Sequence, residues 1–199
     1  MVINRKELKT NAKKQIKGNV GTFFGLSIVI GLIISISGIT AIGPLLLAGA
    51  FSVGIAMFSL EVVRQKKGNF NTGFKGFKQF GSSFVATLLM NIFICLWSLL
   101  LFIPGIIATL RYSMTYFILA DNPEMSGSEA IKKSKEIMKG HKGELFVLLF
   151  SFFRWYVLCL ITFGLAAIYV SPYIHATIAN LYEQIKGEPT EKIEPHADN

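Results

Sequence analysis

Long apolar segments separated by short polar segments dominate the chain. We predict six membrane-spanning helices from these segments, at residues 20–42, 44–63, 82–103, 106–120, 144–163 and 165–183. An α-helix rises about 1.5 Å per residue, so that about 20 apolar residues cross a hydrocarbon core of roughly 30 Å. The pattern therefore predicts an all-α, polytopic membrane protein with a single six-span membrane domain over residues 1–186.

Breaks at glycine divide the six predicted spans into three helical hairpins. The breaks lie at Gly43-Pro44, Pro104-Gly105 and Gly164. Because only a turn separates the two spans of each pair, we expect those spans to pack antiparallel. The three predicted units cover residues 1–63, 64–121 and 122–186.

A short basic amphipathic helix is predicted before the first hairpin, in residues 3–18. Asn4 is a typical N-cap, Glu7 follows it three residues later, and Gly18 can end the helix. The apolar face of this helix consists of Leu8, Ala12 and Ile16. The helix is too short to cross a bilayer, so we expect it to lie in the cytosolic interface with its lysines toward lipid headgroups.

Similar basic segments precede the second and third hairpins and are also predicted to be interfacial helices. Residues 64–81 have a candidate cap at Asn71 or Thr72. Three phenylalanines recur there at helical spacing, at Phe70, Phe74 and Phe77. In the third unit, Ser126 and Glu129 have the spacing of a capping box.

The three units are similar enough to indicate an internal repeat. Gly18, Gly81 and Gly140 are predicted to end the basic helices, and they precede the hairpin glycines by 25, 24 and 24 residues. The sequence AKKQIKGNVGTFF, which begins at Ala12, also resembles SKEIMKGHKGELF, which begins at Ser134. The alternative is that bilayer thickness alone sets these spacings, since every hairpin needs about 20 residues per crossing.

The distribution of positive charge predicts the orientation in the membrane. Of the 20 Lys and Arg residues, 6 precede the first span, 5 lie in residues 64–81, 5 in residues 121–143 and 2 in the tail. The turns at the opposite ends of the hairpins contain no charged residue. Because positively charged short loops stay in the cytosol, both termini and the basic helices are predicted to face the cytosolic side of the cytoplasmic membrane.

Composition excludes several other classes of protein. With 52% hydrophobic and 16% charged residues, the chain is too apolar for a soluble domain of this size. The net charge of +8 would attract anionic headgroups of the inner leaflet, whereas nucleic-acid binding requires a basic face on a polar domain. Cys95 and Cys159 lie inside apolar runs and are predicted to be buried and unpaired. The charged, proline-containing tail at residues 187–199 is predicted to be disordered.

Four segments carry a family resemblance. They are YSMTYFILADNPEMS from Tyr112, AIKKSKEIMKGHKGELF from Ala130, residues 151–155, and SPYIHATIANLYE from Ser171. These segments resemble the bacterial integral membrane family known as domain of unknown function 975, and the resemblance covers most of the chain. It implies a six-span membrane protein without a known catalytic site.

A second, more distant resemblance involves Ile103-Pro104-Gly105 and residues 134–140. These residues are similar to the membrane domain of glycerophosphodiester phosphodiesterases. The catalytic barrel fold needs roughly 250 residues, which this chain lacks, so the resemblance implies no activity.

The sequence contains no recognisable catalytic constellation. His141, His175 and His196 have no partner at metal-ligand spacing, and the chain lacks both a phosphate-binding glycine loop and a nucleophile elbow. We therefore predict a non-enzymatic protein without a metal or other cofactor.

Four polar residues are predicted to lie within the spans: Asn91, Arg111, Arg154 and His175. Their sequence positions place them about 12–15 Å from the cytosolic flank, in one layer. An arginine at mid-membrane costs at least about 2.5 kcal/mol on insertion scales, and no carboxylate shares this depth. In one interpretation the two guanidinium groups bond exposed carbonyls or extend along their own helices to the interface. In the other, Arg111 and Arg154 converge on an anion such as a lipid phosphate in a polar cavity.

Two classes of function remain. The first is a membrane component that binds lipid, peptide or a membrane-protein partner, as an envelope-stress or immunity factor does. The second is a transporter or flippase-like component for a small or amphipathic anionic solute. The first is favoured because no span carries the paired ionisable groups of a proton relay. The sequence determines neither the partner nor the oligomeric state.

The predicted topology can be tested with single cysteines in a background in which Cys95 and Cys159 are replaced by Ser. Gly43→Cys, Gly105→Cys and Gly164→Cys should react with a membrane-impermeant maleimide added outside intact cells, because these turns are predicted to face away from the cytosol. Lys75→Cys and Lys135→Cys should react only after the cells are permeabilised. Labelling of either lysine position from outside would contradict the orientation.

Overall fold

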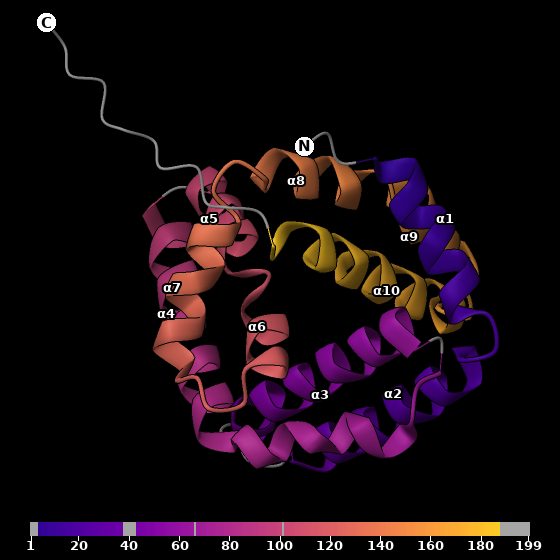
Figure 1. Cartoon of the computed structure of the whole chain (residues 1–199), viewed down its shortest axis with the longest axis horizontal. Coiled ribbons are helices and arrows are strands. Elements are labelled where there is room, and N and C mark those ends of the chain that lie inside the picture. The colour runs from indigo at the N-terminus through magenta and orange to yellow at the C-terminus, as the bar shows by residue number, and fades with distance from the viewer. Residues whose placement is uncertain (1–3, 38–42, 66, 101, 188–199) are drawn as a thin grey trace, which may run out of the picture.

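The computed structural model describes residues 4–37, 43–65, 67–100 and 102–187, which contain no strand (Figure 1). In chain order the elements are α1 (Arg5–Ile16), α2 (Val20–Ser37), α3 (Gly43–Gln65), the 3₁₀-helix η1 (Phe70–Gln79), α4 (Phe80–Leu100), α5 (Phe102–Tyr112), α6 (Thr115–Asp121), α7 (Gly127–Ile137), α8 (Lys142–Phe150), α9 (Phe153–Ile161) and α10 (Ala167–Ile185). The predicted all-α fold is confirmed. Residues 188–199 of the predicted tail lie outside the described residues.

Several helices have the length and composition of membrane spans. Four stretches of the described chain qualify: Leu46–Gln65, Phe70–Leu99, Ile103–Asp121 and Lys142–Ile161. The pair α1 and α2, bent by 85°, would add a fifth if it is one broken span. Helix α10 does not qualify, and Ser171, His175 and Asn180 make it more polar than the other predicted spans. The count of six spans therefore stays a prediction, and residues 38–42 of the first span lie outside the described part.

Three helices, α3, α6 and α10, form the centre of the bundle (Figure 1). Helix α3 packs against both α6 and α10. The rings of Phe117 on α6 and Tyr182 on α10 stack with their centroids 5.6 Å apart. Ile118, Leu119 and Leu181 are fully buried here, so these helices contribute a large part of the core.

The other apolar helices, above all α4 and α9, form an outer layer. Helix α9 contains no buried residue. Exposure is greatest near the ends of the hairpins, at 87% for Leu99 and 99% for Phe163. Such an apolar surface is unfavourable in water, so lipid is its expected surroundings. The predicted burial of Cys95 is wrong, because this outer layer exposes it, and Cys159 is half-buried; both thiols are free.

Each basic segment forms a helix that packs against a central helix. Helix α1 packs on α10, η1 on α3, and α7 on α6 (Figure 1). The predicted apolar face of α1 is confirmed, since Leu8, Ala12 and Ile16 are at most 2% exposed. The three basic helices are therefore built into the bundle and are not free in solvent.

Local sequence signals define where α1 and α7 begin. The Asn4 side chain accepts hydrogen bonds from the backbone N–H groups of Lys6 and Glu7. Ser126 and Glu129 form the predicted reciprocal capping box. The hydrogen bonds that the Ser126 side chain and backbone donate lower the pKa of the Glu129 carboxyl group, because they favour its charged form.

Two of the three predicted glycine stops are confirmed. Gly18 and Gly140 follow α1 and α7 with φ angles of +94° and +95°, a left-handed conformation that glycine adopts at no steric cost. The stop predicted at Gly81 is wrong. Gly81 lies inside α4, because η1 continues directly into that helix.

The second basic segment is a 3₁₀-helix in close contact with α3. Gly76 faces α3 directly, whereas a Cβ atom at Gly73 would overlap the Leu26 side chain of α2. A Cβ atom at Gly54 of α3 would overlap the carbonyl oxygen of Gly73, and one at Gly76 would overlap that of Ala50. The small residues therefore allow the two backbones to touch.

The phenylalanines of this segment also pack on α3. The rings of Phe74 and Phe77 lie 6.2 and 5.0 Å from the ring of Phe51, edge to face. The N-cap of the segment is Asn69, which accepts a hydrogen bond from the Asn71 N–H. The prediction of a cap at Asn71 or Thr72 is therefore wrong, because both residues lie inside η1.

Two predicted spans are broken helices. The span at 106–120 divides into α5 and α6 at Ser113, and the span at 144–163 divides into α8 and α9 at Ser151. The Ser113 hydroxyl donates to the Leu110 carbonyl at 2.9 Å, and the Ser151 hydroxyl donates to the Leu148 carbonyl. Such bonds compete with the helical hydrogen bonds and favour a bend or break at these positions.

The hairpin turns agree only in part with the predicted positions. Gly164, with a φ angle of +89°, lies in the turn between α9 and α10 as predicted. Pro104 and Gly105 instead lie in the first turn of α5, where proline is tolerated because that N–H has no helical partner. Gly43 is the first residue of α3.

The contact between α3 and η1 can be tested by adding one methyl group. Gly54→Ala should lower the free energy of unfolding by about 1–3 kcal/mol, because the new Cβ cannot fit beside Gly73. The thermal midpoint in detergent, followed by tryptophan fluorescence, measures the effect. Gly21→Ala in α2 is the matched control, since a Cβ there meets nothing within 4 Å. Equal midpoints for the two variants would contradict the close contact.

Candidate functional site

A groove lies where α1 meets α9 and α10. Its lining residues come from all three helices and from the break between α8 and α9: Lys9, Ser151, Arg154, Trp155, Leu158 and Tyr173. The groove has a volume of ≈ 550 Å³, within the range of about 300–1,000 Å³ that is usual for ligand sites. It combines two cationic side chains with an aromatic wall.

Lys9 is held in place by the end of α8. Its Nζ atom donates to the Ser151 carbonyl oxygen at 3.2 Å and lies 4.2 Å from the centroid of the Phe152 ring. This carbonyl is available because the last carbonyls of a helix have no partner within it. Partial burial lowers the pKa of the Lys9 ammonium group. An ammonium has three donors, so Lys9 can still donate to a ligand.

Arg154 supplies the second positive charge. It lies in the first turn of α9 and is exposed. A guanidinium group binds phosphate or carboxylate oxygens with two parallel hydrogen bonds. Within the described part of the chain, neither Arg154 nor Lys9 forms an ion pair with a carboxylate. The groove therefore has an excess of positive charge.

An aromatic cluster forms the wall of the groove. The Trp155 ring lies 6.2 Å from the Tyr169 ring and 5.8 Å from the Tyr173 ring. Phe152 packs edge to face on Tyr173 at 5.1 Å. Because Trp and Tyr are enriched at membrane–water interfaces, this composition fits the headgroup level of a bilayer.

A polar network fixes α1 on α10. The amide groups of Gln15 and Asn180 exchange two hydrogen bonds, of 3.3 and 2.6 Å. Gln15 also donates to the carbonyl of Val63 in α3 at 3.1 Å. One side chain thus joins three helices, and its position determines where the lysines of α1 lie.

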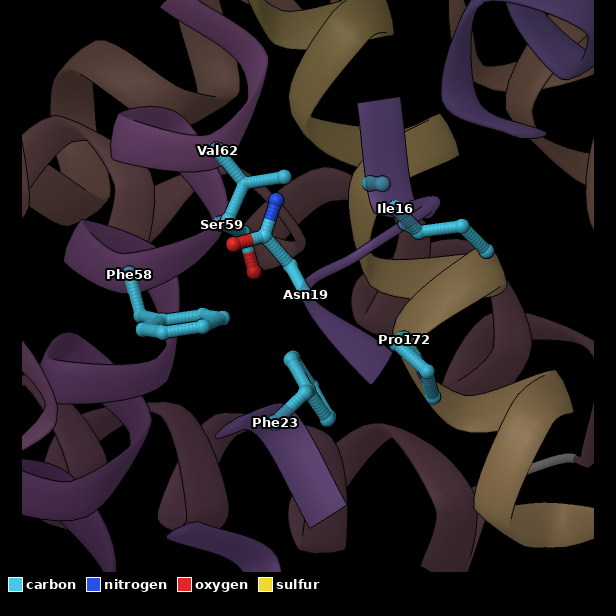
Figure 2. A pocket seen from close by; sticks show the side chains of 8 residues that line it. Ile16, Asn19, Phe23, Phe58, Ser59, Val62 and Pro172 are labelled. Carbon is cyan, nitrogen blue, oxygen red and sulfur yellow. The ribbon is translucent and has the colours of Figure 1, made fainter. Parts of the chain in front are cut away.

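The corner between α1 and α2 is fixed in a similar way. Figure 2 shows the Asn19 side chain pointing from this corner toward Ser59 and Val62 of α3. Its carbonyl oxygen accepts from the Gly68 N–H at 2.9 Å, and its amide nitrogen donates to the Gln15 carbonyl at 3.2 Å. The cavity beside Asn19 has a volume of only ≈ 10 Å³, so it is too small for a ligand.

One group of charges in the bundle is paired in an ion cluster. Arg64, at the end of α3, forms ion pairs with Asp121 of α6 at 2.7 Å and with Glu183 of α10 at 2.6 Å. Lys186 contacts the same two carboxylates at 3.3 and 2.9 Å, and the Tyr182 hydroxyl donates to Asp121 at 3.2 Å. This ion cluster joins the ends of the three central helices. Its role is therefore structural, in contrast to the unpaired cations of the groove.

The four residues predicted to form a polar layer lie in different surroundings. Asn91 is exposed on α4, where its amide donates to the Thr87 carbonyl at 2.8 Å. His175 is half-buried, with its ring 5.6 Å from that of Phe23. Arg111 is half-buried on α5, and its carbonyl accepts from the Ser134 hydroxyl of α7. Only Arg154 lines the groove.

The structure does not bring the four together through any direct contact. No hydrogen bond or ion pair joins two of them in the ranges that the structure describes. Helices α5 and α9, which carry Arg111 and Arg154, lie on opposite sides of the bundle (Figure 1). Anion binding by this set stays a prediction, and the geometry favours Lys9 over Arg111 as the partner of Arg154. Sequence pattern could not identify Lys9, because 142 positions separate it from Ser151.

Among the described residues, no group of three or more His, Cys, Asp or Glu side chains could hold a metal ion. His141 instead pairs with Glu144 at 2.9 Å.

Comparison with known protein families gives a match over most of the chain. The model of a family described as protein of unknown function (DUF975) matches residues 1–107 and 98–189. No curated protein and no solved structure matches the chain.

The ion cluster should stabilise the fold in a salt-dependent manner. Asp121→Asn should lower the free energy of unfolding by about 1 kcal/mol at low salt, because Arg64 and Lys186 each lose a partner that is mostly shielded from solvent. The loss should shrink in about 1 M salt, where the screening length falls to roughly 3 Å. Glu124→Gln, which removes an exposed carboxylate, is the control. If both substitutions lowered the free energy of unfolding equally, the ion cluster would make no specific contribution to stability.

Proposed function

The chain belongs to DUF975, a family of proteins of unknown function, and we propose that it is a non-enzymatic integral membrane protein that binds anionic lipid headgroups. The site is the groove between α1, α9 and α10. The observation that carries this proposal is the pair of cations without carboxylate partners, Lys9 and Arg154, in an aromatic groove of ≈ 550 Å³.

The surroundings of the groove support a lipid over a soluble anion. Leu158 lines the groove together with the two cations. The adjoining surface of α9 is apolar and exposed, with Val157 at 43% and Leu160 at 81%. A ligand with a phosphate and acyl chains would satisfy both the positive charge and this apolar surface.

We propose that this membrane is the bacterial cytoplasmic membrane, crossed six times with both termini in the cytosol. The position of the lysines supports this orientation, because the three basic helices would then all lie at the anionic inner leaflet. The packing also supports an internal repeat. Helices η1 and α7 each pack on the last helix of the preceding unit, and α1 packs on the last helix of the third unit.

The lipid site can be tested by titrating phosphatidylglycerol into the protein in neutral detergent and measuring retained lipid by native mass spectrometry. Lys9→Gln with Arg154→Gln should reduce retention at least about tenfold, because each charge-assisted hydrogen bond is worth about 1.5–3 kcal/mol and 1.4 kcal/mol is tenfold in affinity.

The matched control removes the same charge elsewhere. Lys132→Gln with Lys139→Gln changes two exposed lysines on or next to α7 and should leave retention unchanged. Thermal midpoints of both double variants establish that they are folded. Equal retention by the folded groove variant and wild type would refute the site.

A further inference from the structure

A second cationic groove adjoins the first along α1. It is lined by Thr10, Lys13, Lys14, Lys17, Gly18, Val20 and Tyr169, and it has a volume of ≈ 570 Å³. Lys9 and Lys13 lie one turn apart on the flank of α1, and Lys17 follows its last residue, so the three lysines form one stripe. The stripe begins in the first groove and continues into the second.

The two grooves share an aromatic wall. Tyr173 lines the first and Tyr169 lines the second, and their rings lie 6.3 Å apart. Trp155 contacts both rings. Only the rings of Tyr169 and Tyr173 therefore separate the two grooves, and one ligand can contact both grooves.

Each groove has its own uncompensated cations. The first has Lys9 and Arg154, and the second has Lys13, Lys14 and Lys17. In the described chain none of the second set forms an ion pair with a carboxylate. A lipid with one phosphate can neutralise one groove only. Two phosphates on one molecule can occupy both, and the second contact then forms at a high effective concentration.

Apolar residues accompany each set of cations. Leu158 lines the first groove and Val20 lines the second. The acyl chains attached to each phosphate can therefore pack on the apolar side chain of the same groove. This arrangement fits a lipid that carries acyl chains on both sides of a central bridge.

We infer that the two grooves form one site for a lipid with two phosphates joined by a short glycerol bridge, that is, a diphosphatidylglycerol. The first phosphate binds Lys9 and Arg154, and the second binds the lysines at positions 13, 14 and 17. The glycerol that joins the two phosphates lies against the aromatic wall between the grooves. This inference rests on the proposed function and adds the second phosphate to it.

The test compares diphosphatidylglycerol with phosphatidylglycerol at equal total phosphate, by native mass spectrometry of the full chain in neutral detergent. The wild type should retain diphosphatidylglycerol at least about tenfold better, a modest gain for two linked contacts. Lys13→Gln with Lys17→Gln should remove this preference and leave the retention of phosphatidylglycerol nearly unchanged. Lys132→Gln with Lys139→Gln should keep the preference.

The outcomes separate this inference from the proposed function. Equal retention of the two lipids by the wild type, or a preference that survives Lys13→Gln with Lys17→Gln, would overturn the two-phosphate site and leave the proposed function intact. Failure of both lipids to exceed phosphatidylethanolamine would overturn both. Competition by glycerol bisphosphate without acyl chains, at the same concentration, would show that the ligand is a soluble anion and would also overturn the lipid site.

Discussion

The contact between α1 and α10 is the interaction on which the arrangement of the candidate site depends. It brings together residues 165 positions apart through the paired amides of Gln15 and Asn180. The buried face of α1 would gain little from folding alone, because helices of this length are marginal without tertiary packing. Packing on α10 buries that face and leaves the lysine flank beside the aromatic wall. Without this contact, the two grooves would lose one side.

Local features of the fold could be predicted from sequence because they depend on neighbouring residues. The Asn4 cap, the Ser126 capping box and the glycine stops at positions 18 and 140 are examples. The prediction that a helix ends at Gly81 is wrong, and neighbouring residues do not show this. Segment η1 packs on α3 and continues directly into α4, which contains Gly81. The breaks at Ser113 and Ser151 lie within apolar sequence, where hydropathy gives no signal.

Fewer features of the candidate groove than of the fold can be predicted from sequence, because the groove is built from distant segments. Arg154 could be selected as an unusual charge inside an apolar run. Depth alone suggests Arg111 as its partner, and depth does not show which side of a bundle a residue faces. From sequence, Lys9 is expected only to be part of a basic interfacial helix, because only the folded chain brings it to Ser151 and Phe152. The aromatic cluster has a partial signal in the sequence, because Trp155, Tyr169 and Tyr173 are interfacial residue types and the two tyrosines lie one helical turn apart on α10.

The joining of α1 to α10 also has a consequence for biosynthesis. The ribosome releases α1 long before α10, so α1 cannot pack on α10 until all the intervening helices have been synthesised. Contacts between such distant residues form late, because they require closure of a long loop. If the chain lies in the membrane as proposed, the basic face of α1 would hold this helix at the anionic membrane surface during this interval by electrostatic attraction. The groove is therefore completed last, so a ligand that occupies it would bind only chains whose assembly is finished.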